Sequence, residues 1–172
     1  MKKVSTRSQI LFQEIHLGKD EKTGKEVETK WEAQIYRHSD GYPEGGVLDD
    51  LERFFKWNSD RNTDVSYTAA NFIYFMKKDM EKYSKEDYMT EEGSRHLKIG
   101  YGVEKADHHI HGDEEYLYRI TVFDDRKPDL KFRGWLIEVA EVRGDNTTFD
   151  NAKYYMTYEL TDDKGLNKII LV

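Results

Sequence analysis

The chain has 172 residues, a length that suits one domain, and we expect a single domain over residues 1–172. Its net charge is −7 at pH 7, so the basic footprint of a protein that binds duplex nucleic acid is missing. Cysteine is absent, which excludes a disulfide framework, a thiolate nucleophile and a zinc site with cysteine ligands. We find no signal peptide and no apolar run near the roughly 18 residues of a membrane span. These features predict an acidic cytoplasmic protein without a membrane partner.

The N-terminal segment has the pattern of a β-hairpin. Residues 5–17 and 30–38 flank a charged stretch with two glycines, and WEAQIYRH alternates apolar and polar positions as a half-buried strand does. The following SDGYPEGG is rich in turn-forming residues and ends the second strand.

Two helices are predicted next, over residues 47–58 and 64–87. In the first, Leu48, Leu51, Phe54 and Phe55 fall on one face at helical spacing. The second carries a broad apolar stripe from residue 69 to residue 80, and Asp64 or Ser66 is placed to cap its first turn.

The rest of the chain alternates strands with short turns. We expect a loop over residues 84–95, strands over residues 96–104, 115–123, 131–142, 152–160 and 166–172, and a turn at residues 124–129. Short turns join antiparallel neighbours. The predicted fold class is therefore α+β, an antiparallel sheet of about five to seven strands with two helices packed on one face. Each tryptophan lies in an apolar periodic segment, so we expect core positions for Trp31, Trp57 and Trp135.

The segment HHIHGD, residues 108–113, holds three of the six histidines. On a strand, His109, His111 and Asp113 would share one face, and two imidazoles with a carboxylate can bind a transition metal. The spacing matches half of the metal motif of metallo-β-lactamase-type hydrolases, but no histidine follows His111, which argues against that family. Gly112 equally favours a plain turn before a strand, so a metal site, a polar ligand-binding loop and a structural turn all stay open.

The segment YRHSDGYPEGG, residues 36–46, joins a strand to a helix. Arginine binds phosphate or carboxylate through its planar fork, and histidine and aspartate can transfer protons or bind metal. Turn chemistry accounts for Asp40 and the glycines, but it does not account for Arg37 and His38 beside Tyr42. A ligand-binding site is therefore one reading of this turn. Arg119 lies in mid-strand, and it either pairs with a carboxylate, with Glu138 as the candidate, or points into a pocket.

The motifs RHSDGYPEG and HGDEEYLY occur together in one chain. In this respect the sequence resembles a group of small phage-borne and bacterial proteins of uncharacterised activity, over residues 5–50 and 98–123. The resemblance implies a shared fold and a shared site and supplies no mechanism.

Two functions follow as expectations. The first is a non-enzymatic protein that sequesters an anionic small molecule, such as a nucleotide or signalling molecule, or binds a host protein in defence or regulation. Its ligand-binding residues would be Arg37, His38, Asp40, Tyr42, His111 and Asp113. The alternative is a metal-dependent hydrolase of the phosphodiesterase or nuclease type, with His38, Asp40, His109, His111 and Asp113 as ligands. The sequence requires no cofactor, a divalent metal would serve the alternative, and the oligomeric state stays open.

Overall fold

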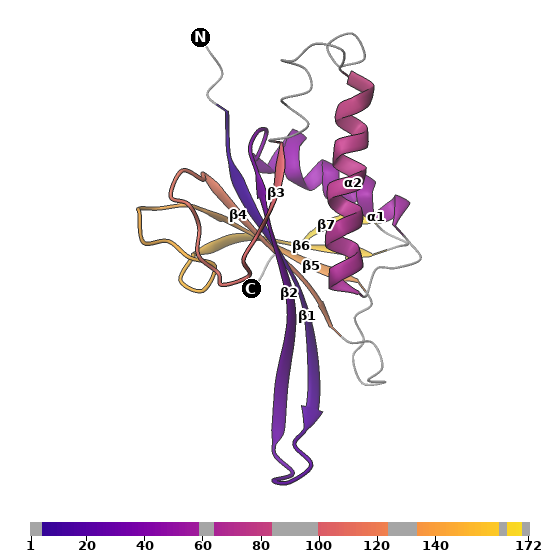
Figure 1. Ribbon diagram of the computed structural model, residues 1–172, viewed down its shortest axis with the longest axis vertical. Helices are drawn as coiled ribbons and strands as arrows, with labels where there is room; N and C mark the ends of the chain where they lie inside the picture. Colours follow the sequence, from indigo (N-terminus) through magenta and orange to yellow (C-terminus); the bar gives the residue numbers. More distant parts are fainter. Residues whose placement is uncertain (1–4, 59–63, 84–99, 124–133, 162–164, 170–172) are drawn as a thin grey trace.

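The computed structural model describes residues 5–58, 64–83, 100–123, 134–161 and 165–169 (Figure 1). Within these residues the chain forms seven strands, two α-helices and one wide turn. In chain order they are β1 (Ser8–Lys19), β2 (Glu26–Arg37), the turn η1 (Pro43–Val47), α1 (Leu48–Trp57), α2 (Val65–Tyr83), β3 (Tyr101–Glu104), β4 (Tyr116–Phe123), β5 (Trp135–Glu141), β6 (Tyr154–Thr161) and β7 (Gly165–Ile169). The loop expected over 84–95 and the turn at 124–129 lie outside the described residues.

The seven strands form one sheet in the order β3-β2-β1-β4-β5-β6-β7. Every neighbouring pair is antiparallel except β1 and β4, which run parallel with Ser8 opposite Tyr116. β3, like β1, is antiparallel to β2. The 105–115 segment then returns the chain to the end of the sheet where β1 begins, so β4 runs in the same direction as β1. The predicted α+β class is confirmed, and the sheet, predicted as antiparallel, is mostly so, with one parallel pair.

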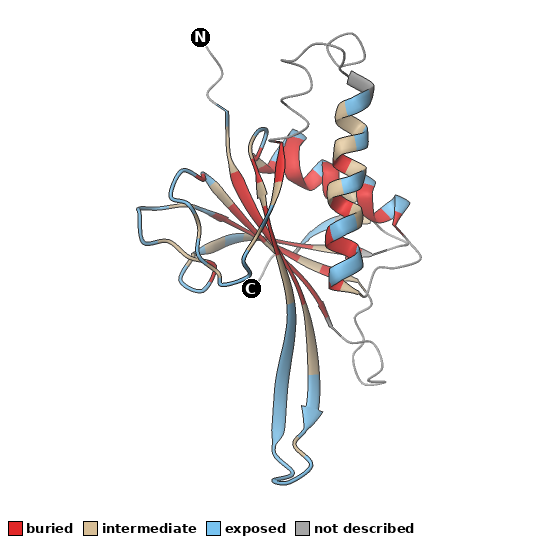
Figure 2. Ribbon diagram, in the orientation of Figure 1, coloured by how far each residue is buried: buried red, intermediate tan, exposed pale blue. Residues whose placement is uncertain are grey.

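Both helices pack on one face of the sheet, as predicted. That face and the helices share a core that includes Ile10 and Phe12 of β1, Leu51 and Phe54 of α1, and Phe72 of α2, all fully buried (Figure 2). The Asp64 carboxylate accepts hydrogen bonds from the backbone N–H groups at the start of α2, so Asp64 is the cap of that helix. Among the described residues, neither helix is long and apolar enough to cross a membrane.

Loops, rather than helices, cover part of the opposite face. A small apolar cluster there is built from Leu11, Leu117, Ala140 and Phe149, with Ile110 packed against it from the 105–115 loop. The two segments that cover this face are residues 105–115 and 142–153, and we call it the loop face. The turn predicted at HGD therefore runs over the sheet instead of simply leading into β4.

The far half of the β1–β2 hairpin extends beyond the body of the protein and is largely exposed (Figures 1 and 2). Trp31 lies on this extension and is 61% exposed, and Trp57 at the end of α1 is 50% exposed, whereas Trp135 is buried at 2%. The expectation of a core position is correct for Trp135 and wrong for the other two. Alternation places Trp31 on the helix-bearing face, but neither of the two described helices reaches that far along the strand.

Candidate functional site

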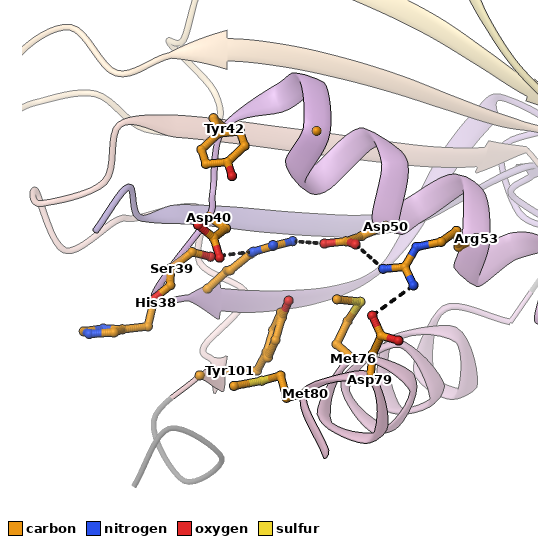
Figure 3. A pocket seen from close by; sticks show the side chains of 13 residues that line it. His38, Ser39, Asp40, Tyr42, Asp50, Arg53, Met76, Asp79, Met80 and Tyr101 are labelled. Carbon is orange, nitrogen blue, oxygen red and sulfur yellow. Dashed lines mark hydrogen bonds and ion pairs between the residues drawn. The ribbon is translucent and has the colours of Figure 1, made fainter. Parts of the chain in front are cut away.

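A cleft of about 280 Å³ lies where the end of β2 meets the 38–46 turn, α1, α2 and the start of β3 (Figure 3). Four of the six predicted ligand-binding residues line it, namely Arg37, His38, Asp40 and Tyr42. The helices contribute Asp50, Arg53, Met76, Asp79 and Met80, and Tyr101 comes from β3. The cleft therefore combines charged groups with an apolar wall of two methionines and an aromatic ring.

The charged groups of the cleft form a continuous ladder of alternating sign. Arg37 Nη1 lies 2.6 Å from Asp50 Oδ2, and the other oxygen of Asp50 accepts a hydrogen bond of 2.5 Å from Arg53 Nη2. Arg53 Nη1 then donates to Asp79 Oδ2 at 2.9 Å. Arg37 Nε donates to the backbone oxygen of Ser39 at 2.7 Å, so both guanidinium groups are already bound (Figure 3).

Burial and neighbouring groups set the charge of Arg37 and of Tyr101. Burial lowers the pKa of the Arg37 guanidinium, but the neighbouring Tyr101 and Asp50 raise it by more, so Arg37 stays charged. Burial raises the pKa of the Tyr101 phenol, and the nearby Arg37 offsets this only in part, so at neutral pH this side chain is a neutral phenol. The Arg37 guanidinium also lies 5.6 Å from the centre of the Tyr101 ring, which favours a cation there.

Asp40 is the carboxylate of the cleft that the ladder does not use. Its side chain is exposed, and within the described residues it accepts no hydrogen bond and forms no ion pair. Counting side chains, the cleft holds the guanidinium groups of Arg37 and Arg53 against the carboxylates of Asp40, Asp50 and Asp79. Among the residues that the structure describes, the carboxylates that line the cleft outnumber the guanidinium groups by one, and Asp40 interacts with Arg37 only through the longer-range attraction of their charges.

The glycines and aspartate of the 38–46 turn are explained by its packing. Asp40 has a φ of 54° and Gly45 a φ of 71°, a region that favours Asp, Asn and Gly. A Cβ at Gly41 would lie 2.7 Å from the Ser8 hydroxyl oxygen, and the backbone oxygen of Gly41 accepts a 2.7 Å hydrogen bond from the Tyr118 hydroxyl. The turn is thus held tightly against β1 and β4, which positions Asp40 and Tyr42 at the cleft.

His38 lies at the rim of the cleft and points away from the ladder (Figure 3). Its Nδ1 atom is 3.3 Å from the Tyr36 hydroxyl, and Tyr36 also stacks against His111, with ring centres 5.1 Å apart. Tyr36 and Arg37 point to opposite faces of the sheet because successive residues of a strand alternate. The two predicted turns therefore meet at Tyr36, but they line different faces, and His111 and Asp113 do not line the cleft.

On the loop face, His111, Asp113 and Glu114 bring three potential metal-binding atoms within 4.8 Å of one another. It is the one such group within the described residues, and His38, Asp40 and His109 are outside it. Asp113 forms an ion pair with Arg7. The carboxylate of Glu114 is buried and already accepts hydrogen bonds from the backbone N–H groups of His111 (3.2 Å) and Gly112 (2.9 Å). These contacts account for both acidic side chains without a metal.

A buried polar network beneath the same loop was not predicted. The Gln9 amide donates to Glu114 Oε1 at 2.8 Å, and the Gln34 amide donates to Gln9 and to the backbone oxygen of His109. Gln9 and Gln34 belong to β1 and β2, so the network fastens the 105–115 loop to the sheet. Both glutamines lie on the loop face, on the polar side of each strand's alternation, so no pattern in the sequence marked them as buried.

His108 is the second feature that sequence reasoning missed. Its Nδ1 atom lies 2.7 Å from Asp150 and its Nε2 atom 2.9 Å from Glu32, so one imidazole links the two loops of the loop face to β2. No sequence pattern marks this triad because its members are far apart along the chain. Arg119, in contrast, pairs with Glu138 through two hydrogen bonds of 2.6 and 2.8 Å, as one of the two readings predicted.

Comparisons of the chain with protein-family models, with curated proteins and with solved structures find no match. The resemblance to phage-borne proteins therefore rests on its two motifs alone.

Proposed function

We propose that this protein is a binding protein whose cleft takes a small organic cation. The observation that carries the proposal is the charge state of the cleft: among the described residues, each guanidinium has an ion-pair partner, whereas the Asp40 carboxylate has none within ion-pair distance. A ligand with an amine or guanidinium group would compensate Asp40 at the rim. Its hydrocarbon portion would pack against Met76, Met80 and Tyr101.

The anionic ligand expected from Arg37 and His38 has weaker support. Arg37 is 5% exposed and is committed to Asp50 and to the backbone of Ser39. An anion could bind Arg37 only by displacing a buried carboxylate, and leaving a charge buried without its partner is costly. His38 points out of the cleft, so it cannot assist from within.

The size and composition of the cleft fit a small ligand. Its volume of about 280 Å³ is at the lower end of the roughly 300–1,000 Å³ typical of small-molecule sites. A nucleotide would protrude, whereas the volume suits a short diamine or a quaternary amine.

The proposal is tested by binding measurements on two matched variants. Putrescine, agmatine and choline are titrated against the protein by calorimetry, with inorganic phosphate and AMP as anionic counterparts. Asp40→Asn removes the unpaired charge and tolerates the left-handed backbone at this position. Asp49→Asn removes an exposed charge on the first turn of α1, outside the cleft, and serves as the control.

We expect at least one of the cations to bind and Asp40→Asn to weaken it by roughly ten-fold, the effect of one charge pair of about 1.4 kcal/mol. Asp49→Asn should bind as the wild type does. Binding of AMP or phosphate in preference to every cation, or equal weakening by both variants, would contradict the proposal.

The second candidate function is the metal-dependent hydrolase, and the observation that favours it is the cluster of His111, Asp113 and Glu114. Two points reduce its support. The acidic members already have protein partners, and Arg37, the expected phosphate-binding group, faces the other side of the sheet. Elemental analysis of the purified protein separates the candidates, because a resident metal lost in His111→Ala would favour the hydrolase.

A further inference from the structure

The projecting part of the hairpin has a strand edge without a partner. β2 pairs with β1 along its whole length, from Glu26 to Arg37, but β3 covers only Gln34–Arg37 of its outer edge. Within the described residues, no strand covers the outer edge from 26 to 33. An exposed edge presents unpaired backbone N–H and C=O groups, which can bind a further strand.

The direction of these backbone groups follows from the pairing with β3. The N–H of His38 donates to the oxygen of Gly100, so the backbone groups of His38 point outward. The β1–β2 register runs without a shift, and backbone direction alternates along a strand. The even-numbered residues of β2, including Glu28, Lys30 and Glu32, therefore point their N–H and C=O groups outward.

We propose that two copies of this chain dimerise by antiparallel pairing of their β2 edges, with Thr29 on the two-fold axis. In this register Glu28 lies opposite Lys30 of the second copy, and each pair exchanges two backbone hydrogen bonds. Val27 lies opposite Trp31 of the second copy. A register centred on Glu28 or on Lys30 would instead place like charges opposite each other on the axis, which is unfavourable.

The exposed side chains of the edge support a second copy as the occupant. Val27 and Trp31 lie on one face of β2 and are 43% and 61% exposed, so the pairing would bury an aliphatic–aromatic contact twice. Glu28 and Lys30 lie on the other face, paired with each other at 3.4 Å, and both are about half exposed. Exposed pairs of this kind are weak, so they can exchange partners between copies.

The hairpin also gains from such a contact. A two-stranded ribbon is marginally stable by itself, and pairing would turn two ribbons into a four-stranded sheet. The register places Glu26 opposite Glu32 of the second copy, but Glu32 already interacts with the His108 imidazole at 2.9 Å, which reduces the repulsion. The contact is short, so we expect a weak, concentration-dependent dimer.

A charge-reversal series tests the register by sedimentation over a range of protein concentrations. Glu28→Lys alone would place Lys opposite Lys, and Lys30→Glu alone would place Glu opposite Glu, at both symmetry-related positions. We expect each single variant to weaken dimerisation roughly ten-fold and the double variant Glu28→Lys/Lys30→Glu to restore it. A wild-type chain that stays monomeric up to its highest soluble concentration overturns the proposal, and so does a double variant as weak as the single ones.

A cysteine cross-link tests the axis independently, since the chain has no cysteine of its own. Directly opposite residues in a non-hydrogen-bonded pair have Cα atoms about 4.5 Å apart, within the roughly 4.4–6.8 Å range of disulfides. Thr29→Cys should therefore form a covalent dimer rapidly under mild oxidation. Val27→Cys, on the same strand and face but opposite Trp31, is the control and should react at least ten-fold more slowly. Equal rates for the two variants overturn the proposed register.

Discussion

Asp50 of α1 binds Arg37 of β2 in a buried ion pair, with 2.6 Å between Oδ2 and Nη1. Arg37 is the residue that first marked the 36–46 turn as a candidate site. The ion pair between Arg37 and Asp50 fastens the end of β2 to the first helix. The cleft is built around this pair, and its ligand-binding capacity depends on groups that the pair leaves unused.

The first prediction compares how much the two ion pairs of Asp50, with Arg37 and with Arg53, contribute to the free energy of unfolding. Asp50→Ala should lower the free energy of unfolding by about 3–5 kcal/mol, because it leaves the buried Arg37 charge without its carboxylate. Arg53→Ala should cost about 1 kcal/mol or less, since the Arg53 side chain is 46% exposed. Urea unfolding of the two variants measures the difference, and equal losses would contradict the burial of the ladder.

The second prediction concerns the fit of the 38–46 turn against β1. Gly41→Ala should destabilise the protein by about 1–3 kcal/mol, because the new Cβ would lie 2.7 Å from the Ser8 hydroxyl oxygen and 2.9 Å from the Arg7 backbone. Gly18→Ala is the control, since no atom lies within 4 Å of its Cβ position. Thermal unfolding should show a lower melting temperature for Gly41→Ala alone.

The third prediction concerns pH and His108. Burial lowers the pKa of His108, but its hydrogen bonds to Asp150 and Glu32 raise it by more, to above its ordinary value of 6.5. The folded protein therefore holds this proton more tightly than the unfolded chain does. The stabilisation is complete below pH 6.5 and is lost as the pH rises through the folded-state pKa.

Unfolding free energies of the wild type and His108→Gln, measured across this range, give the contribution as their difference. The difference should shrink as the pH rises. His109→Gln removes an exposed imidazole from the same loop and serves as the control for the substitution itself. A gap between wild type and His108→Gln that is constant with pH would show that the imidazole contributes no titrating charge.

The sequence predicted the elements of the fold well because their signals are local. Each signal reports which side of a single strand or helix is buried. Examples are the alternation in WEAQIYRH and EYLYRITVF and the 3.6-residue spacing of Leu51, Phe54 and Phe55. These signals did not predict how far along each strand the helices cover the sheet. Trp31 has the alternation of a core residue, yet it lies past the point where the helices cover the sheet.

The candidate site was predicted in part for a similar reason. The sequence identified Arg37, Asp40 and Tyr42 as candidates. The other charged groups of the cleft are Asp50, Arg53 and Asp79. They lie on helices, where charged residues are typical of a solvent-exposed face. Tyr36 and Arg37 are neighbours on a strand, so their side chains point to opposite faces of the sheet. For this reason the two predicted turns line opposite faces. A motif shows which residue types are present. The net charge of the cleft depends in addition on ion-pair partners elsewhere in the chain.

The most direct test of the central claim uses the methionine methyl groups. The chain has five methionines, of which Met76 and Met80 line the cleft and Met156 lies on β6. In a ¹³C-methyl-methionine spectrum, titration with the organic cation that binds should shift the Met76 and Met80 signals and leave Met156 unchanged. In Asp40→Asn the same shifts should require a roughly ten-fold higher ligand concentration. Methyl shifts that respond only to AMP or phosphate, or that appear at Met156 and not at the cleft, would contradict a cation-binding cleft.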